Sequence, residues 1–296
     1  MAKKLFLAIL VVAAFFISCS KEDLKAIKPA YLSIPDLDLK TDYVAEGSAH
    51  SKITTVWVFA NDKSIGVFNL PCIIPILEEG NTKIEVYAGV NMNGIDATRV
   101  LYSPYKKFEG TVNLSVLDTN YLLAAKVPEI TYSDIATVLI VEDFDQTGQN
   151  LSKTARSDTN FIRSKKASEV FINPDEVEDN GKVGVFTLDG EKTFFEAFTS
   201  EIYDLPKGSQ SVFLEMTYKN EIPITLGVVA QIPGGSEQAQ TIYLYESEEW
   251  NKIYINLVTE ISSYPSANGF KIFVGAIKPD SMDSAKVYLD NIKIAY

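Results

Sequence analysis

The sequence is poor in the residues on which metal sites, disulfide frameworks and nucleic-acid surfaces depend. It has two cysteines and one histidine, His50, in 296 residues. A histidine-dependent catalytic triad or a multi-histidine zinc site cannot be assembled from one imidazole without other ligands. Two cysteines allow at most one disulfide, so the fold depends on hydrophobic cores. Acidic residues outnumber basic ones by 39 to 27. This balance argues against nucleic acid as a partner, because its phosphates require Lys/Arg patches.

The longest apolar run is N-terminal. It spans Leu5–Ile17, follows Lys3 and Lys4, and ends at Ser18. This is the layout of a secretory signal, and about a dozen residues are too few to cross a bilayer core of roughly 30 Å. The residues Phe-Ile-Ser-Cys at 16–19 resemble a bacterial lipobox, in which the cysteine is acylated and becomes the new N-terminus. The resemblance implies lipidation at Cys19, which leaves the other cysteine without an intramolecular partner.

The residues after the cysteine bear on where the chain is delivered. Ser20 replaces the aspartate that usually retains lipoproteins in the inner membrane, and Lys-Glu-Asp at 21–23 resembles the export tag of Bacteroidota surface lipoproteins. The resemblance implies an outer-membrane, lipid-anchored protein that faces the cell exterior. A plain solvated tether is the alternative. We therefore predict a signal peptide at 1–18 and a lipidated tether at 19–29. Removal of the signal changes the formal net charge from −12 to −14.

The segment 30–127 predicts a small β domain. Short β-branched and aromatic runs, such as 54–59 and 82–87, alternate with turn residues such as Asn61–Ser64. The stretches 58–68 and 75–86 resemble immunoglobulin- or transthyretin-like modules of cell-envelope proteins, which act as spacers or docking platforms. Pro128 interrupts any strand ladder, and we place the domain boundary there.

The segment 128–296 predicts a larger β domain. The alternation is clearest over Ser211–Lys219, where Val212, Leu214, Met216 and Tyr218 share one face. Residues 146–166 are polar and predict a long loop. No convincing helical periodicity is present. The predicted fold class is all-β, a small immunoglobulin/transthyretin-like β-sandwich followed by a larger jelly-roll β-sandwich.

Three motifs of this second segment carry a further resemblance. Glu-Asp-Phe-Asp at 142–145, the run 250–257 that begins with Trp250, and the run 287–294 look like a jelly roll of the carbohydrate-binding-module type. In that family a structural calcium often ties the first strand to the last. By position the resemblance implies Glu142, Asp143 and Asp290 as its ligands. The alternative is that Asp290 caps or pairs locally. We expect no other cofactor.

Glycan binding needs exposed aromatic rings that stack on sugar faces. Tyr203, Tyr245 and Tyr264 lie in or beside predicted loops, and we take them as the ligand-binding candidates. Trp250 is expected in the core.

Two short patterns in one loop suggest modification. Asp-Ser-Met and Asp-Ser-Ala, at 280–282 and 283–285, resemble the O-glycosylation sequence of Bacteroidota envelope proteins. The resemblance implies glycosylation of Ser281 and Ser284. A plain acidic turn is the alternative.

The leading functional prediction is a non-catalytic, surface-exposed lipoprotein whose jelly roll recognises a glycan or a partner protein. An accessory or structural subunit of an outer-membrane transport, secretion or gliding complex is the alternative. A glycosidase that uses only carboxylates is a third hypothesis. The local acid clusters at 142–145 and 175–179 lack the Glu-x-Asp-x-x-Glu spacing of jelly-roll glycosidases.

Overall fold

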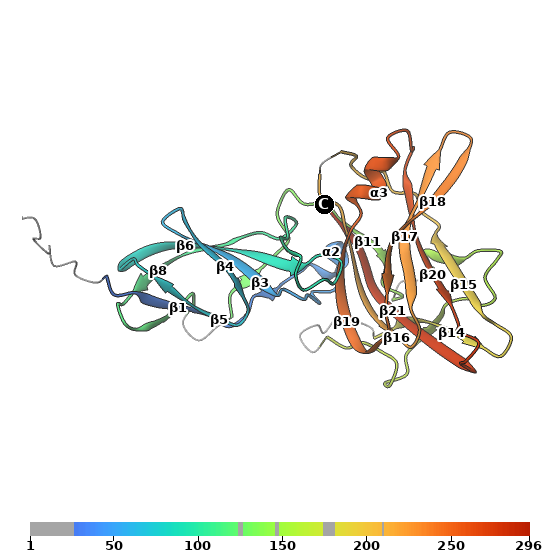
Figure 1. Ribbon diagram of the computed structural model, residues 1–296, viewed down its shortest axis with the longest axis horizontal. Helices are drawn as coiled ribbons and strands as arrows, with labels where there is room; N and C mark the ends of the chain where they lie inside the picture. The colour runs from blue at the N-terminus through green and yellow to red at the C-terminus, as the bar shows by residue number, and fades with distance from the viewer. Residues whose placement is uncertain (1–26, 124–126, 146–147, 174–180, 209) are drawn as a thin grey trace, which may run out of the picture.

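The computed structural model describes residues 27–123, 127–145, 148–173, 181–208 and 210–296. The signal peptide, Cys19 and the Lys-Glu-Asp segment lie outside these residues. Figure 1 shows an elongated molecule in which two β units lie end to end. We call them the N-terminal unit and the C-terminal sandwich. The all-β prediction is confirmed, with two short helices in the described residues that the sequence had not indicated.

The N-terminal unit contains a three-stranded sheet in the order β5-β1-β9 and a five-stranded sheet in which β4-β3-β6-β7 are joined by β8, paired to β6. The strands β10 and β2 pair separately. One hydrophobic cluster fills the space between them. The elements are β1 (Ala30–Ile34), β2 (Asp38–Leu39), α2 (Tyr43–Glu46), β3 (Thr55–Ala60), β4 (Lys63–Asn69), β5 (Cys72–Ile76), β6 (Gly80–Asn91), β7 (Arg99–Leu101), β8 (Phe108–Leu114), β9 (Thr119–Tyr121) and β10 (Glu129–Ile130).

The predicted turn at Asn61–Ser64 is confirmed as a hairpin between β3 and β4. Asn61 and Asp62 have φ of 46° and 62°. Two consecutive positive φ angles match the right-handed twist of the flanking strands, and Asn and Asp tolerate them better than most residues.

The predicted boundary at Pro128 falls slightly early. Glu129 and Ile130 form β10 against β2, and Tyr132 packs in the same cluster as the N-terminal strands. The change from one core to the other therefore lies between Tyr132 and Val141, the first residue of the C-terminal cluster.

The C-terminal sandwich consists of two antiparallel sheets stacked on one core. The six-stranded sheet runs β13-β14-β21-β16-β19 with β11 on β21, and the five-stranded sheet runs β12-β15-β20-β17-β18. The elements are β11 (Val138–Glu142), β12 (Leu151–Lys153), β13 (Ile162–Ser164), β14 (Val183–Asp189), β15 (Phe194–Thr199), β16 (Phe213–Asn220), β17 (Ile224–Ile232), β18 (Gly235–Leu244), β19 (Ser247–Asn256), α3 (Val258–Ser263), β20 (Phe270–Ile277) and β21 (Ser284–Ala295).

The long loop predicted over residues 146–166 is wrong in part. Two three-residue edge strands, β12 and β13, lie within it. Leu151 and Phe161 are buried in the sandwich core, so two apolar residues widely spaced in a polar stretch hold the segment against both sheets.

The N-terminal unit covers the outer face of the six-stranded sheet. The predicted alternation in β16 is confirmed, and it places Leu214 and Met216 in the sandwich core. On the opposite face Phe213 joins the hydrophobic cluster of the N-terminal unit, together with Tyr254 and Ala295. Both faces of the sheet are therefore buried, and one apolar core continues across the junction.

A buried ion pair lies at this junction. Glu215 of β16 and Lys252 of β19 have fully buried side chains, with Oε2 and Nζ 2.8 Å apart. The hydroxyls of Tyr102 and Tyr132, both from the N-terminal unit, donate to Oε1 of Glu215 at 2.7 Å each. Lys293 of β21 donates to the carbonyl of Ser48 at 2.6 Å. Glu215 Oε1 and Lys293 Nζ of the sandwich thus find hydrogen-bond partners in the N-terminal unit.

These contacts keep Glu215 ionised. Burial alone raises the pKa of a carboxyl group, because it disfavours the charged form. Lys252, Lys293 and the hydrogen bonds outweigh burial here and lower the pKa of Glu215 to about 2. Glu215 is therefore ionised in the folded protein at neutral pH, with its charge balanced mainly by the two lysines of the same sheet.

We expect Glu215→Gln to destabilise the protein by about 3–5 kcal/mol, because it leaves Lys252 buried beside an uncharged group. Urea unfolding of the mature chain measures this. The matched control is Glu109→Gln, whose carboxylate pairs with Lys107 at 2.7 Å on the surface. An exposed pair contributes about 0–1 kcal/mol. Equal losses for the two variants would contradict the interpretation.

Candidate functional site

The outer face of the five-stranded sheet lies on the side of the sandwich remote from the N-terminal unit (Figure 1). We call it the distal face. Across its strands Glu196 pairs with Gly275, Gly275 with Thr225, and Thr225 with Tyr243. Side chains of cross-strand partners project to the same side. The row therefore runs from a carboxylate, across a glycine and a threonine, to a tyrosine.

A second row, parallel to the first, contains two phenylalanines and a glycine. Phe198 pairs with Phe273, and Phe273 pairs with Gly227. The ring of Phe273 occupies the place of a side chain at 227, since a Cβ there would lie 2.7 Å from Phe273 Cε1 and 2.2 Å from the carbonyl of Ala239. Glycine is required at 227 for this packing, and the Phe273 ring fills the space above it. The open glycine of this face is Gly275, where a Cβ would meet no atom closer than 3.7 Å.

Two exposed tyrosines lie at the β18 edge of the distal face. Tyr243 on β18 is 49% exposed and Tyr245 just beyond it is 74% exposed. Their ring centroids are 5.5 Å apart, with an interplanar angle of 87°. Residues two apart on an extended strand point the same way, so both rings belong to the distal face.

The opposite end of the row is formed by the charged residue Glu196, which is held by hydrogen bonds. Glu196 accepts hydrogen bonds from Thr154 Oγ1 at 2.9 Å and from Arg156 at 3.0 Å. The guanidinium of Arg156 also lies over the ring of Phe194, 5.3 Å from its centroid. An arginine fixed at both contacts presents its remaining N–H groups in a defined direction. The distal face thus combines exposed rings, a small-residue floor and oriented polar groups.

The three tyrosines predicted as ligand contacts have different positions. Tyr245 borders the distal face, and its role stays a prediction. Tyr264 follows α3 and packs in part against the sandwich core. The prediction for Tyr203 does not fit, because its ring is buried and its hydroxyl accepts a hydrogen bond from Asn150 at 2.7 Å. Tyr243 was missed, although the alternation from Thr241 to Tyr245 was a usable signal.

The acids predicted for calcium do not form a ligand group. Among the residues that the structure describes, no set of three or more His, Cys, Asp and Glu is placed to hold a metal ion. The Glu142 carboxylate accepts from the backbone N–H groups of Phe144, Asn150 and Leu151, at 2.9, 2.6 and 3.3 Å. Asp290 accepts from the N–H of Asn291 at 2.8 Å. The carboxylates of Glu142 and Asp290 are thus directed to backbone N–H groups, and calcium binding stays a prediction.

The Glu-Asp-Phe-Asp motif has a structural explanation instead. Phe144 adopts a positive φ of 57° and its ring packs where Gly184 has no side chain. The bond from Phe144 N–H to Glu142 holds this conformation. Burial raises the pKa of Glu142, despite its three N–H donors. The carboxylate therefore anchors the turn that carries a core ring.

The other predicted positions are less informative. Ser281 and Ser284 are exposed, and their glycosylation stays a prediction. Cys72 is a free, half-buried thiol whose pKa is raised by burial. The acid cluster at 175–179 lies outside the described residues. No helix in the described part of the chain is both long and apolar enough to span a membrane.

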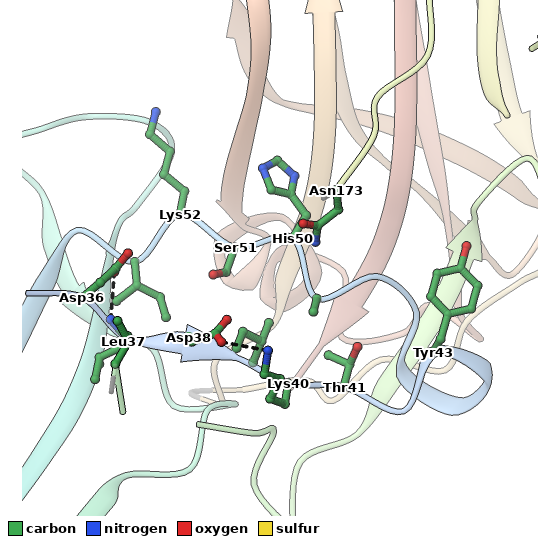
Figure 2. A pocket seen from close by; sticks show the side chains of 14 residues that line it. Asp36, Leu37, Asp38, Lys40, Thr41, Tyr43, His50, Ser51, Lys52 and Asn173 are labelled. Carbon is green, nitrogen blue, oxygen red and sulfur yellow. Dashed lines mark hydrogen bonds and ion pairs between the residues drawn. The ribbon is translucent and has the colours of Figure 1, made fainter. Parts of the chain in front are cut away.

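A pocket of about 700 Å³ opens where the segment 36–53 passes along the junction, lined also by Val127 and Asn173. Figure 2 shows that its polar side chains do not converge, since His50 and Lys52 point away from Asp36 and Asp38. Lys40 pairs with Asp38 at 2.8 Å, and Lys52 donates to Asn251. The pocket therefore shows no arrangement of acid, base and nucleophile.

His50, the single histidine, belongs to the junction. Its Nδ1 lies 2.8 Å from Thr217 Oγ1, and its ring packs on Phe171 with centroids 4.2 Å apart. Burial, followed by the charges of Lys252 and Lys293, lowers its pKa to about 3. The imidazole is neutral at physiological pH and acts as a packed polar group.

The comparisons with known proteins yield solved structures that resemble part of this chain, but they do not assign the chain to a family. No protein-family model and no curated protein matches the chain. Among solved structures, a variant of a family 29 carbohydrate-binding module matches with TM-score 0.34 and 8% identity, over 54% of this chain and 85% of that one. A family 30 module of a Clostridium thermocellum cellulosomal cellulase matches with 0.38 and 12%, over 53% and 96%. A carbohydrate-binding protein from the β-sandwich superfamily matches with 0.38 and 12%, over 90% and 97%. With TM-scores below 0.5, these likenesses assign neither a family nor a ligand.

The burial of His50 predicts acid lability. Its pKa is about 3 in the folded protein and 6.5 as a model value, so the unfolded chain binds a proton first as the pH falls below about 6.5. Stability is then lost toward lower pH. We expect the free energy of unfolding to fall by about 1–2 kcal/mol between pH 7 and pH 5.

The raised pKa of Glu142 acts in the opposite sense as the pH falls, so the comparison of the native protein with a His50 variant isolates the histidine. Urea unfolding at the two pH values gives the difference for the native protein. His50→Gln keeps a polar group at the site and removes the titration, and its stability should change much less. A native pH dependence that survives in His50→Gln would show that other groups cause it.

Proposed function

We propose that the protein is a non-catalytic binding protein, anchored by lipid at the outer membrane and exposed to the cell exterior, whose C-terminal sandwich recognises a glycan on its distal face. The observation that carries the proposal is the composition of that face. Exposed rings of Tyr243 and Tyr245 lie in line with the small residues Thr225 and Gly275, with Glu196 and Arg156 on the opposite side.

These features match what a sugar requires. A pyranose ring has an apolar face that stacks on aromatic rings and an edge of hydroxyls that need fixed donors and acceptors. Gly275 carries no side chain and leaves space for a sugar ring lying along the sheet. The acidic chain, with a formal net charge of −12, favours a neutral glycan over a polyanionic one.

The arrangement of the units suits a surface receptor. The described chain enters the N-terminal unit at the end remote from the sandwich (Figure 1). An anchor at Cys19 would place the N-terminal unit next to the membrane and the distal face away from it. The continuous core and the buried ion pair at the junction support a fixed spacing between the two.

An accessory subunit of an outer-membrane complex is the second candidate. The feature that favours it is on the three-stranded sheet of the N-terminal unit, where Ile73 and Tyr121 are both cross-strand partners of Ser33. They are 63% and 54% exposed. Neighbouring apolar side chains on an outer sheet face are typical of a docking surface.

Glycan-array screening of the mature chain without lipid, residues 20–296, followed by calorimetry on the best ligand, tests the distal face. Tyr243→Ala and Tyr245→Ala should each weaken binding about tenfold, or ~1.4 kcal/mol, because a stacking ring is lost. Tyr121→Ala, an exposed tyrosine of the N-terminal unit, is the matched control and should bind normally. Absence of any glycan binding, together with a co-purified membrane complex, would support the second candidate instead.

Cys19→Ala tests the anchor separately. Without the acylated cysteine the processed chain has no lipid and should move from the membrane fraction to the soluble fraction. Mass spectrometry of the native N-terminal peptide should show the acyl groups. Retention of Cys19→Ala in the membrane fraction would refute lipid anchoring while leaving glycan binding open.

A further inference from the structure

Three exposed apolar side chains lie at the end of the N-terminal unit where the described chain begins. Ile27, Leu77 and Leu117 are 72%, 63% and 60% exposed. We call these residues the apolar tip. Single exposed apolar residues are common in soluble proteins, so the feature of interest is that three of them share one end of the unit.

The strand pairing brings the tip residues together from distant parts of the chain. Ala30 pairs with Ile76 on one side, and Leu77 follows Ile76 directly. On the other side Ala30 bridges to Val116, and the N–H of Leu117 donates to the carbonyl of Pro29 at 2.9 Å. The two leucines therefore flank the backbone that leads to Ile27.

The loop that carries Leu117 is held in shape by Asn120. Its Oδ1 accepts from the N–H of Ser115 at 3.0 Å, and its Nδ2 donates to the carbonyls of Ser115, Asp118 and Tyr31, at 3.3, 3.1 and 3.2 Å. The exposed leucine is thus presented by a fixed loop.

Leu117 has a backbone conformation that leucine disfavours. Its φ is 63°, in the left-handed region where glycine and asparagine are the common residues. A turn that only connected two strands would be more stable with glycine or asparagine at this position. The leucine gains no burial in return within the protein, which indicates a role for its side chain outside the folded chain.

The distance to the proposed anchor identifies the partner. Cys19 precedes Ile27 by eight residues. Eight extended residues reach at most about 28 Å. Acyl chains on Cys19 would therefore hold the apolar tip close to a bilayer. Lys28, Glu79 and Asp118 border the tip and are exposed, and their small net negative charge favours a zwitterionic surface over an anionic one.

We propose that the apolar tip inserts into the interfacial layer of the membrane to which Cys19 is attached, and so orients the molecule with its distal face outward. This inference depends on the lipid anchoring proposed above. The acyl chains supply attachment, and the leucines supply a second contact that a flexible tether cannot provide.

The experiment uses the full lipidated chain with Cys72→Ser and a single Leu117→Cys carrying an environment-sensitive fluorophore. The protein is reconstituted in phosphatidylcholine vesicles with or without brominated acyl chains. Brominated lipid should quench the label at 117 about twofold or more. The same label at Ile277→Cys, an exposed position on β20 that is 67% exposed, is the control and should be unaffected.

A second measurement avoids the label. Hydrogen exchange of residues 115–119 in the native lipidated protein should slow at least threefold on vesicles relative to detergent, and Leu77→Ser/Leu117→Ser should abolish the difference. If the protein floats with vesicles but neither quenching nor slowing occurs, the anchor holds and the tip proposal is wrong. If the protein does not float, the anchor itself fails. Protection in native cell envelopes without quenching by brominated lipid would assign the tip to a protein partner and overturn the proposal.

Discussion

The ion pair between Glu215 and Lys252 governs how the rest of the molecule is arranged. Both side chains are fully buried, and a charge in such a position is tolerated only when partners replace its water. The six-stranded sheet supplies Lys252, but the two tyrosine hydroxyls on the carboxylate come from the N-terminal unit. An isolated sandwich would leave these groups facing solvent beside Phe213 and Tyr254. The outer face of the six-stranded sheet therefore requires the N-terminal unit to cover it.

Covering one sheet determines which outer face remains exposed. The sandwich has two outer faces, and the N-terminal unit covers one of them with a continuous core. The distal face carries the exposed tyrosines and lies on the side away from the junction. The same polar contacts that stabilise the junction thus fix the direction in which the free face points.

The sequence could predict what depends on local pattern. The alternation over Ser211–Lys219 gave the strand and its core face, and Asn61–Asp62 gave the hairpin turn, because period and turn chemistry are local properties. It could not predict that Glu215 and Thr217 are buried too, since that follows from a partner more than 80 residues away in the chain, such as Tyr132. The strands within residues 146–166 were missed for a related reason, as only Leu151 and Phe161 mark them.

The candidate site was predictable only in part. Tyr245 was chosen because it lies beside a turn, but the same reasoning chose Tyr203, which bridges to Phe270 and is buried. Proximity to a turn says nothing about which side of a sheet a ring occupies, whereas strand alternation does, and it links Tyr243 to Tyr245. The row from Glu196 to Tyr243 was harder to predict. Its members are far apart in sequence, and only the pairing of β15, β20, β17 and β18 places them on one face.

The Glu-Asp-Phe-Asp motif shows how an acid can serve the fold by itself. Glu142 directs its carboxylate to the backbone N–H groups of Phe144, Asn150 and Leu151. These bonds fix the backbone that places the Phe144 ring in the core, where Gly184 makes room for it. The strands β11 and β21 are joined by their own backbone pairing. The presence of the acid in the motif therefore does not require a metal.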